Sequence, residues 1–98
     1  MRHWHNDSTT QLCTALLSLK TQEEACAFLE DLCTIKEFLD LSQRLEVARL
    51  LHSGASYSSI TKTTGASTAT ISRVSKCCEY GTGGYRTVIE RLAGEEEK

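Results

Sequence analysis

Apolar residues recur at helical spacing through most of the chain, and in its first half they predict three helices. These helices cover Ser8–Ser18, a segment that begins after Thr21, and Ile35–His52. The third carries apolar residues on more than one face, so we expect it to be central and to have neighbours on several sides. The three apolar stripes are Leu12, Ala15 and Leu16; Ala25, Phe28, Leu29 and Leu32; and Ile35, Phe38, Leu39, Leu41, Leu45, Ala48, Leu50 and Leu51.

Helix boundaries are marked by local side chains. Thr21 with Glu24 has the spacing of a capping box, in which each side chain satisfies a backbone N–H of the other. Thr34 with Glu37 repeats this spacing before the third helix. Gly54 follows Ser53 and should end that helix.

Residues 54–78 predict two short helices joined by a tight turn. The first is Tyr57–Thr63, the turn is Thr64–Ala66, and Ser67 caps a second helix that runs toward Cys78. Gly65 can adopt the positive φ that stops the first helix. We expect Ile60, Ile71 and Val74 to close a small apolar wedge that fixes the angle between the helices.

The outward face of the second helix carries short, hydroxylated or basic side chains, which suit a DNA major groove. The net charge is only −2, but all 13 acidic residues lie at or before Glu46, or at or after Glu79. The stretch between them contains four Lys or Arg residues, including Arg49, and would attract phosphates. The candidate DNA-binding residues are Lys62, Ser67, Thr68, Ala69, Thr70, Ser72, Arg73 and Lys76.

Among these residues, Thr68, Ala69, Thr70 and Ser72 are expected to face base edges. None of them can make a bidentate pair with guanine, so reading would depend on water bridges and DNA shape. Lys62, Arg73 and Lys76 are expected to bind phosphates. Arg49 either joins them or is structural.

The last quarter predicts a turn and one short helix. Gly81–Gly84 lacks the Lys and the preceding strand of a phosphate-binding loop, so it is interpreted as a turn or hinge. A helix over residues 84–93 follows, with its apolar stripe beginning after Tyr85. Residues 94–98 are expected to form a solvated tail.

Composition fits one all-α domain of 98 residues, with no Pro and 40% apolar residues. Of the five cysteines, Cys13, Cys26 and Cys33 are interpreted as small core residues of a reduced, cytoplasmic protein. No apolar run is long enough for a membrane span, and the N-terminus has no apolar signal core. His3 and His5 could bind a metal with Cys13, but a loose terminus is preferred, and no metal is expected.

Catalysis is not expected. No nucleophile–base pair with an orienting acid is evident, His52 is better explained as a helix C-terminal cap, and adjacent Cys77 and Cys78 could bridge only with strain. The alternative to DNA binding is a dimeric adaptor that docks the same helical surface on a partner protein.

Four segments resemble the tryptophan repressor family, and more closely its YerC/YecD group. They are LSLKTQEEACAFLEDLCTIKE, QRLEVARLLHSG, TGASTATISRV and YGTGGYRTVIERL, which together cover about residues 12–92. The resemblance implies a six-helix, all-α, intertwined homodimer in which residues 8–53 form dimerisation and core helices. It also implies transcription-factor activity, most simply that of a repressor. The apolar stripes of the first two helices need a partner, so we infer a twofold dimer that reads a palindromic site with two helices roughly 34–36 Å apart.

The same resemblance implies a possible effector pocket at Thr34, Arg44 and Arg73. In the tryptophan repressor these positions serve the corepressor L-tryptophan, and a glycine beside the second arginine leaves room for the indole. This chain has Val74 there, has Cys33 before Thr34, and has a turn one residue shorter. L-tryptophan is therefore not expected as a corepressor, and a small-molecule effector stays open. Arg44 could instead pair with Asp40 or Glu46 or bond a helix end, and for Arg73 the phosphate contact is preferred.

Overall fold

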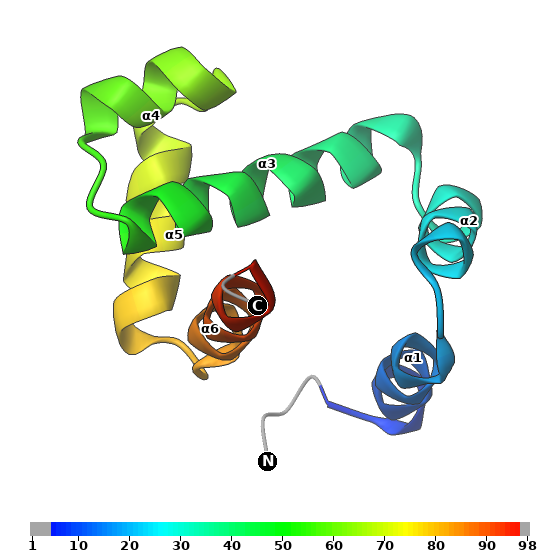
Figure 1. Ribbon diagram of the computed structural model, residues 1–98. Helices are drawn as coiled ribbons and strands as arrows, with labels where there is room; N and C mark the ends of the chain where they lie inside the picture. Colours follow the sequence, from blue (N-terminus) through cyan, green and yellow to red (C-terminus); the bar gives the residue numbers. More distant parts are fainter. Residues whose placement is uncertain (1–4, 97–98) are drawn as a thin grey trace. The chain divides into compact units, whose positions relative to one another are not determined.

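The computed structural model describes residues 5–96, with side chains through residue 94, and these residues form helices and no strand. The predicted all-α fold is confirmed. Two compact units are present, Met1–Phe38 and Leu39–Lys98, and each is described by itself. The six helices are α1 (Asp7–Ser18), α2 (Gln22–Leu32), α3 (Ile35–His52), α4 (Tyr57–Thr64), α5 (Thr68–Tyr80) and α6 (Gly84–Glu96) (Figure 1).

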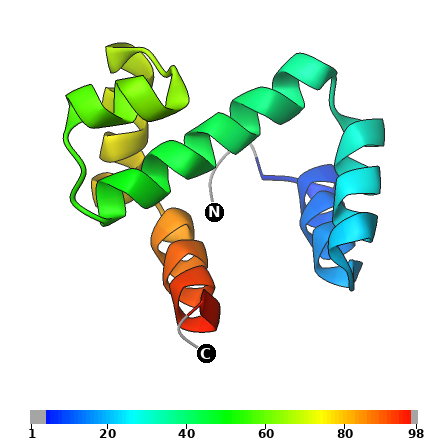
Figure 2. The same cartoon turned by 45° about the horizontal axis from the view of Figure 1, so that its top comes forward.

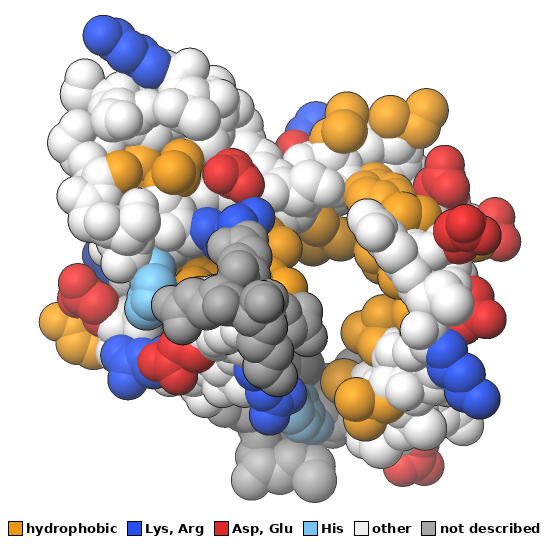
Figure 3. Space-filling model, viewed as in Figure 1, with side chains coloured by type: hydrophobic (Ala, Val, Ile, Leu, Met, Phe, Trp, Pro, Cys, Tyr) orange, Lys and Arg blue, Asp and Glu red, His pale blue; other side chains and the backbone are white. Residues whose placement is uncertain are grey.

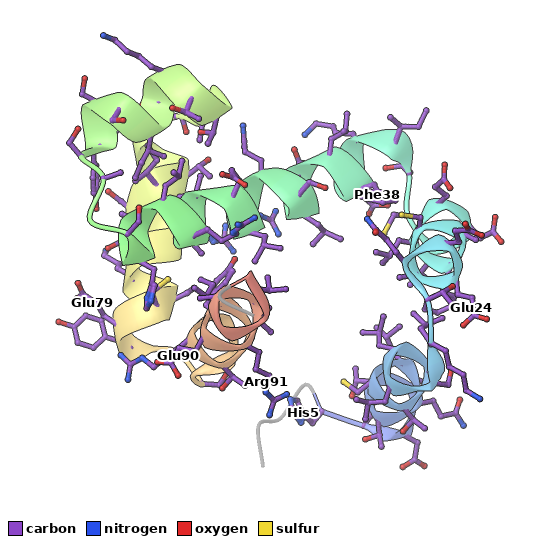
Figure 4. The ribbon with its side chains drawn as sticks, viewed as in Figure 1. His5, Glu24, Phe38, Glu79, Glu90 and Arg91 are labelled. Carbon is purple, nitrogen blue, oxygen red and sulfur yellow. The ribbon has the colours of Figure 1, made fainter. Side chains whose placement is uncertain are left out.

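The helices α2 and α3 begin at the threonine caps that the sequence indicated, whereas α1 begins at Asp7 after an Asn6 cap that was not predicted. The Thr21 hydroxyl accepts the Glu24 N–H at 3.1 Å, while the Glu24 carboxylate (labelled in Figure 4) accepts the Lys20 N–H at 2.8 Å. In a capping box this carboxylate would accept the N–H of Thr21, whereas here it accepts the N–H of the residue before the cap, Lys20. At the start of α3 both bonds of the box are present, because the Thr34 hydroxyl accepts the Glu37 N–H at 3.1 Å and the Glu37 carboxylate accepts the Thr34 N–H at 2.8 Å.

The first unit buries little of its apolar surface. Neither α1 nor α2 has a buried residue, and Leu17 and Ile35 are 86% and 83% exposed. Figure 3 shows hydrophobic side chains at the surface of α1 and α2 and at the start of α3. The prediction that Cys13 and Cys26 are core residues is wrong for the single chain, because both are exposed and only Cys33 is half-buried.

The core lies in the second unit. Its residues come from α3, α4, α5 and α6 and from the position before Ser67. The helix α5 packs against both α4 and α6 (Figures 1 and 2). The expectation that α3 is covered on several sides holds only for its second half, since Leu39 and Leu41 are 63% and 44% exposed. The core residues are Val47, Ala48, Ile60, Ala66, Ile71, Val74 and Ile89.

The connection between α5 and α6 is the turn that the glycines predicted. The Gly81 N–H bonds the Cys77 carbonyl at 2.9 Å, and a Cβ at Gly81 would collide with that carbonyl oxygen. The backbone can close on the end of α5 only because this position has no side chain. No helix within residues 5–96 is long and apolar enough to cross a membrane.

The final helix is longer than predicted. It begins at Gly84 as expected but continues through Glu96, so residues 94–96 are helical rather than part of a tail. Gly94 weakens a helix without ending it, and no Pro follows to stop the chain. Residues 97 and 98 lie outside the described part of the chain.

Candidate DNA-binding surface

The helix α4 has a cap at each end. The Ser56 hydroxyl accepts the Ser59 N–H at 3.1 Å, and Gly65 ends the helix with φ +75°, where its N–H bonds the Thr61 carbonyl. Only glycine adopts this left-handed conformation without strain. The predicted role of Gly65 is confirmed, and the Ser56 cap is an addition that the sequence analysis had not identified.

The turn after α4 is held mainly by Thr64. Its hydroxyl donates to the Ile60 carbonyl at 2.8 Å and accepts the N–H of the buried Ala66 at 3.1 Å. Its own carbonyl accepts a hydrogen bond from the side-chain amide of Gln43 on α3, with 3.2 Å between Nε2 and the oxygen. This bond spans 21 positions of sequence, and the sequence analysis had not predicted it.

Ser67 begins α5 and also contacts its neighbour Thr70. The Ser67 hydroxyl accepts the Thr70 N–H at 3.1 Å and donates to the Thr70 hydroxyl oxygen, also at 3.1 Å. The predicted cap is confirmed. Because accepting this bond leaves the Thr70 O–H able to rotate, Thr70 can still donate to a ligand.

The surface of α5 is divided into a buried and an exposed face. Ile71 and Val74 are at most 2% exposed and, with Ile60, close the predicted wedge. Four of the candidate DNA-binding residues on α5 are exposed, while Thr70 and Ser72 are half-buried, and neither is sealed inside. The exposed four are Thr68, Ala69, Arg73 and Lys76; Lys62 on α4 is also exposed.

An ion pair distinguishes Arg49 from the exposed cations Lys62, Arg73 and Lys76. A guanidinium nitrogen of Arg49 lies 3.8 Å from a carboxylate oxygen of Glu46, one helical turn earlier on α3. This ion pair favours the structural interpretation of Arg49. It also gives Glu46 a partner other than Arg44, which had been one of the alternatives for that arginine.

The proposed effector residues lie in both units. Thr34 belongs to the first unit and caps α3, whereas Arg44 and Arg73 are exposed on α3 and α5 of the second. Burial raises the pKa of Tyr85 on α6, with a smaller contribution from Cys77, and the positive charge of Arg44 acts in the opposite direction. The Val74 side chain is part of the buried core. It therefore fills the space beside Arg73 that a glycine at this position would leave empty.

A cavity of about 280 Å³ is lined by residues of α3, α5 and α6. Burial is the main cause that raises the pKa of the Cys78 thiol, followed by the charges of Cys77 and Glu79, while Arg86 lowers it. Figure 4 shows Glu79 at the end of α5 and Glu90 on α6. The cavity is lined by Ala48, Leu51, His52, Ser75, Cys78, Glu79, Arg86 and Ile89.

Metal-ligating groups do not gather in the described part of the chain, where no three His, Cys, Asp or Glu side chains could share an ion. His3, one of the residues considered for a metal site, lies outside that part. His52 is the last residue of α3 and is exposed, as expected for a residue near a helix end. All five cysteines are free thiols.

Comparison with known proteins assigns this arrangement to a family. The model of the Trp repressor protein family matches residues 7–93. The uncharacterized protein YerC of Bacillus subtilis (strain 168) is 51% identical over 86 residues, which are 88% of this chain and 83% of YerC.

Solved structures agree with the sequence match. A TrpR-like protein from Eubacterium eligens ATCC 27750 has a TM-score of 0.86 at 52% identity, covering 90% of this chain and 91% of that one. A candidate Trp repressor from Staphylococcus aureus has a TM-score of 0.87 at 39% identity, covering 91% and 89%. With its six helices and the capped pair α4 and α5, this chain belongs to the Trp repressor family, a family of DNA-binding regulators rather than of enzymes.

Proposed function

We propose that this protein is a sequence-specific transcriptional repressor that reads a palindromic operator as a homodimer, with α5 of each subunit in the major groove. The observation that carries the proposal is the exposed face of α5. This face is backed by the buried wedge and lies within a stretch, Val47–Cys78, that contains no acidic residue. A surface of this kind can approach the phosphate backbone without repulsion.

The side chains of the face divide into two roles. Thr68 and Ala69, at the exposed start of α5, bring methyl groups that can contact thymine and a hydroxyl that can donate or accept. Thr70 and Ser72 extend this set toward the half-buried edge. Lys62, Arg73 and Lys76 contact phosphates and fix the orientation of the helix without reading sequence.

The homodimer is supported by apolar surface that one chain leaves open. Leu17, Leu32, Ile35 and Leu39 are 53–86% exposed and lie on α1, α2 and the first half of α3. Single exposed apolar residues are ordinary, but several on consecutive helices mark an interaction surface. In a twofold dimer the two copies of α5 would lie roughly one DNA turn apart, about 34–36 Å.

L-tryptophan is not the effector in this proposal. The Val74 side chain is 2% exposed and packs with Ile71 in the core, so indole could enter beside Arg73 only by displacing it. Isothermal calorimetry is expected to show no heat with L-tryptophan, with or without DNA. Saturable heat would contradict this part of the proposal. We also propose that the protein acts in the cytoplasm, because a transcriptional repressor has to reach its DNA operator.

The test is selection of bound duplexes from a random pool with the full chain. Enrichment of a symmetric sequence would support both specific reading and the dimer. A gel-shift series against mixed genomic fragments, at about 50 and about 200 mM salt, measures the phosphate contribution. If no fragment is retained even at the lower salt, the proposal is wrong and the adaptor becomes the better explanation of this surface.

A further inference from the structure

Three hydrogen bonds, made by residues that are linked along the chain from Thr64 to Ser67, connect α3 with the turn and with the first turn of α5. The Gln43 amide donates to the Thr64 carbonyl, the Thr64 hydroxyl accepts the N–H of Ala66, and the next residue, Ser67, accepts the N–H of Thr70. The distances lie between 3.1 and 3.2 Å. Of these contacts, only the Gln43 bond connects elements that are far apart in the sequence.

The Thr64 carbonyl needs such a partner because of its position. It belongs to the last residue of α4, where carbonyls have no donor within the helix. The bond with Gln43 is partly buried, so water competes for this oxygen less easily than at an open surface. An uncharged side-chain amide can donate here without bringing a charge into the site.

We propose that Gln43 is a positioning residue for DNA reading, which fixes the turn between α4 and α5 and thereby the direction in which α5 presents Thr68 and Ala69. Gln43 itself contacts no DNA. This inference rests on the proposed function for its DNA readout, but the effect on the turn can be measured without DNA.

The wedge of Ile60, Ile71 and Val74 sets how closely α4 and α5 pack, but apolar contacts are not directional. A hydrogen bond restricts both distance and angle, and α3 is the element against which the turn is fixed. Removing the Gln43 donor should therefore loosen the orientation of α5 while the core stays packed. Contacts with base edges should weaken more than contacts with phosphates, because the long lysine and arginine side chains can follow a change in the orientation of α5.

The test compares Gln43→Met, which keeps the length and bulk of the side chain but has no donor, with Gln11→Met at an exposed position of α1. Amide hydrogen exchange at Ala66 is expected to accelerate by roughly 3- to 10-fold in Gln43→Met and to stay unchanged in Gln11→Met. Gln43→Glu, which also lacks the donor, should behave like Gln43→Met. Equal Ala66 exchange in all three variants and the unmodified protein would overturn the proposal.

The DNA measurement uses the duplex enriched from the random pool and a scrambled duplex of the same length. The ratio of the two affinities should fall roughly 3- to 10-fold in Gln43→Met, with the salt dependence of binding unchanged. An unchanged ratio despite faster Ala66 exchange would show that the turn does not direct reading, and would reject the inference. If the unmodified protein binds neither duplex, the proposed function fails, whereas Ala66 exchange still decides whether Gln43 holds the turn.

Discussion

The Ser67 hydroxyl lies 3.1 Å from both the backbone nitrogen and the side-chain oxygen of Thr70. One side chain thus caps α5 and also holds the side-chain oxygen of a candidate base-reading residue. Stability and sequence preference are therefore linked at this position.

Substitution of this cap tests the link. Ser67→Ala should lower the free energy of unfolding by about 1 kcal/mol, since one N–H of the first turn loses its partner. It should also change the preferred site, because Thr70 is no longer held. Ser56→Ala removes the equivalent cap of α4 and is the matched control. Urea unfolding and repeated site selection measure the two effects, and an identical enriched site for both variants would contradict the role assigned to Ser67.

A second prediction concerns the phosphate contact of Lys76. Lys76→Ala should weaken binding to all sequences by a similar factor and reduce the slope of log K against log salt by about 0.9, as expected when one phosphate contact is lost. Lys20→Ala removes an exposed lysine between α1 and α2 and should leave the slope unchanged. Fluorescence anisotropy over a salt series provides the measurement. Equal slopes for the two variants would exclude a phosphate contact at Lys76.

A third prediction concerns the homodimer. Ile35→Asp places a charge at an 83% exposed apolar position, and an acid is favourable in the first turn of α3. The helix should therefore persist while self-association weakens by roughly 10-fold or more. Tyr80→Asp is the control, because Tyr80 is equally exposed but lies at the end of α5. Light scattering after size exclusion should find Ile35→Asp shifted toward monomer, and a fully dimeric variant would place the interface elsewhere.

Two glycines should respond to alanine in opposite directions. Gly65→Ala should destabilise the protein by about 1–2 kcal/mol, because φ +75° is left-handed, although no atom would meet the added Cβ. Gly94→Ala, within α6 and equally free of contacts, should stabilise the protein by about 0.5–1 kcal/mol. Thermal unfolding of both variants checks the sign. Stabilisation by Gly65→Ala would show that the turn does not need this conformation.

Because the pKa of the Cys78 thiol is raised, we expect the folded protein to lose stability in alkaline solution. Its pKa in the folded protein is raised above the ordinary value of 9.0, chiefly by burial, so the folded state favours the neutral thiol. Stability is therefore unaffected below pH 9.0 and declines as the pH rises from there through the raised value. In Cys78→Ala this decline should be shallower as the pH rises above 9.0. Tyr85, whose pKa is raised from 10.0, adds its own decline only above pH 10. Cys13→Ala, at an exposed position of α1, serves as the control, and equal declines in both variants would contradict the assignment.

The sequence was most informative where structure depends on neighbouring residues. The caps at Thr34 and Ser67 and the end of α4 at Gly65 each involve residues within four positions of one another, and all were predicted. The wedge of Ile60, Ile71 and Val74 was predicted because the two short helices had already been identified. These features define the candidate DNA-binding surface, and the family comparison agrees with them.

Features that depend on distant residues were missed or wrong. The bond from Gln43 to Thr64 joins positions 21 apart, and no local pattern marks it. Cys13 and Cys26 share the spacing of apolar stripes, which predicts burial but not what covers the stripe, and in the described part of one chain both cysteines are exposed. The end of α6 was placed too early because the polar residues 94–98 were interpreted as a solvated tail, although the helix continues through Glu96.

The short side chains at the start of α5 have a consequence for the thermodynamics of recognition. Ala69 has no side-chain rotamers to lose, and Ser67 and Thr68 have few, so immobilising them against bases sacrifices far less conformational entropy than immobilising glutamine or arginine would. Their limited reach, however, requires the helix backbone itself to approach the floor of the groove. Operators that widen readily at this point should therefore be favoured over equally complementary but stiff ones.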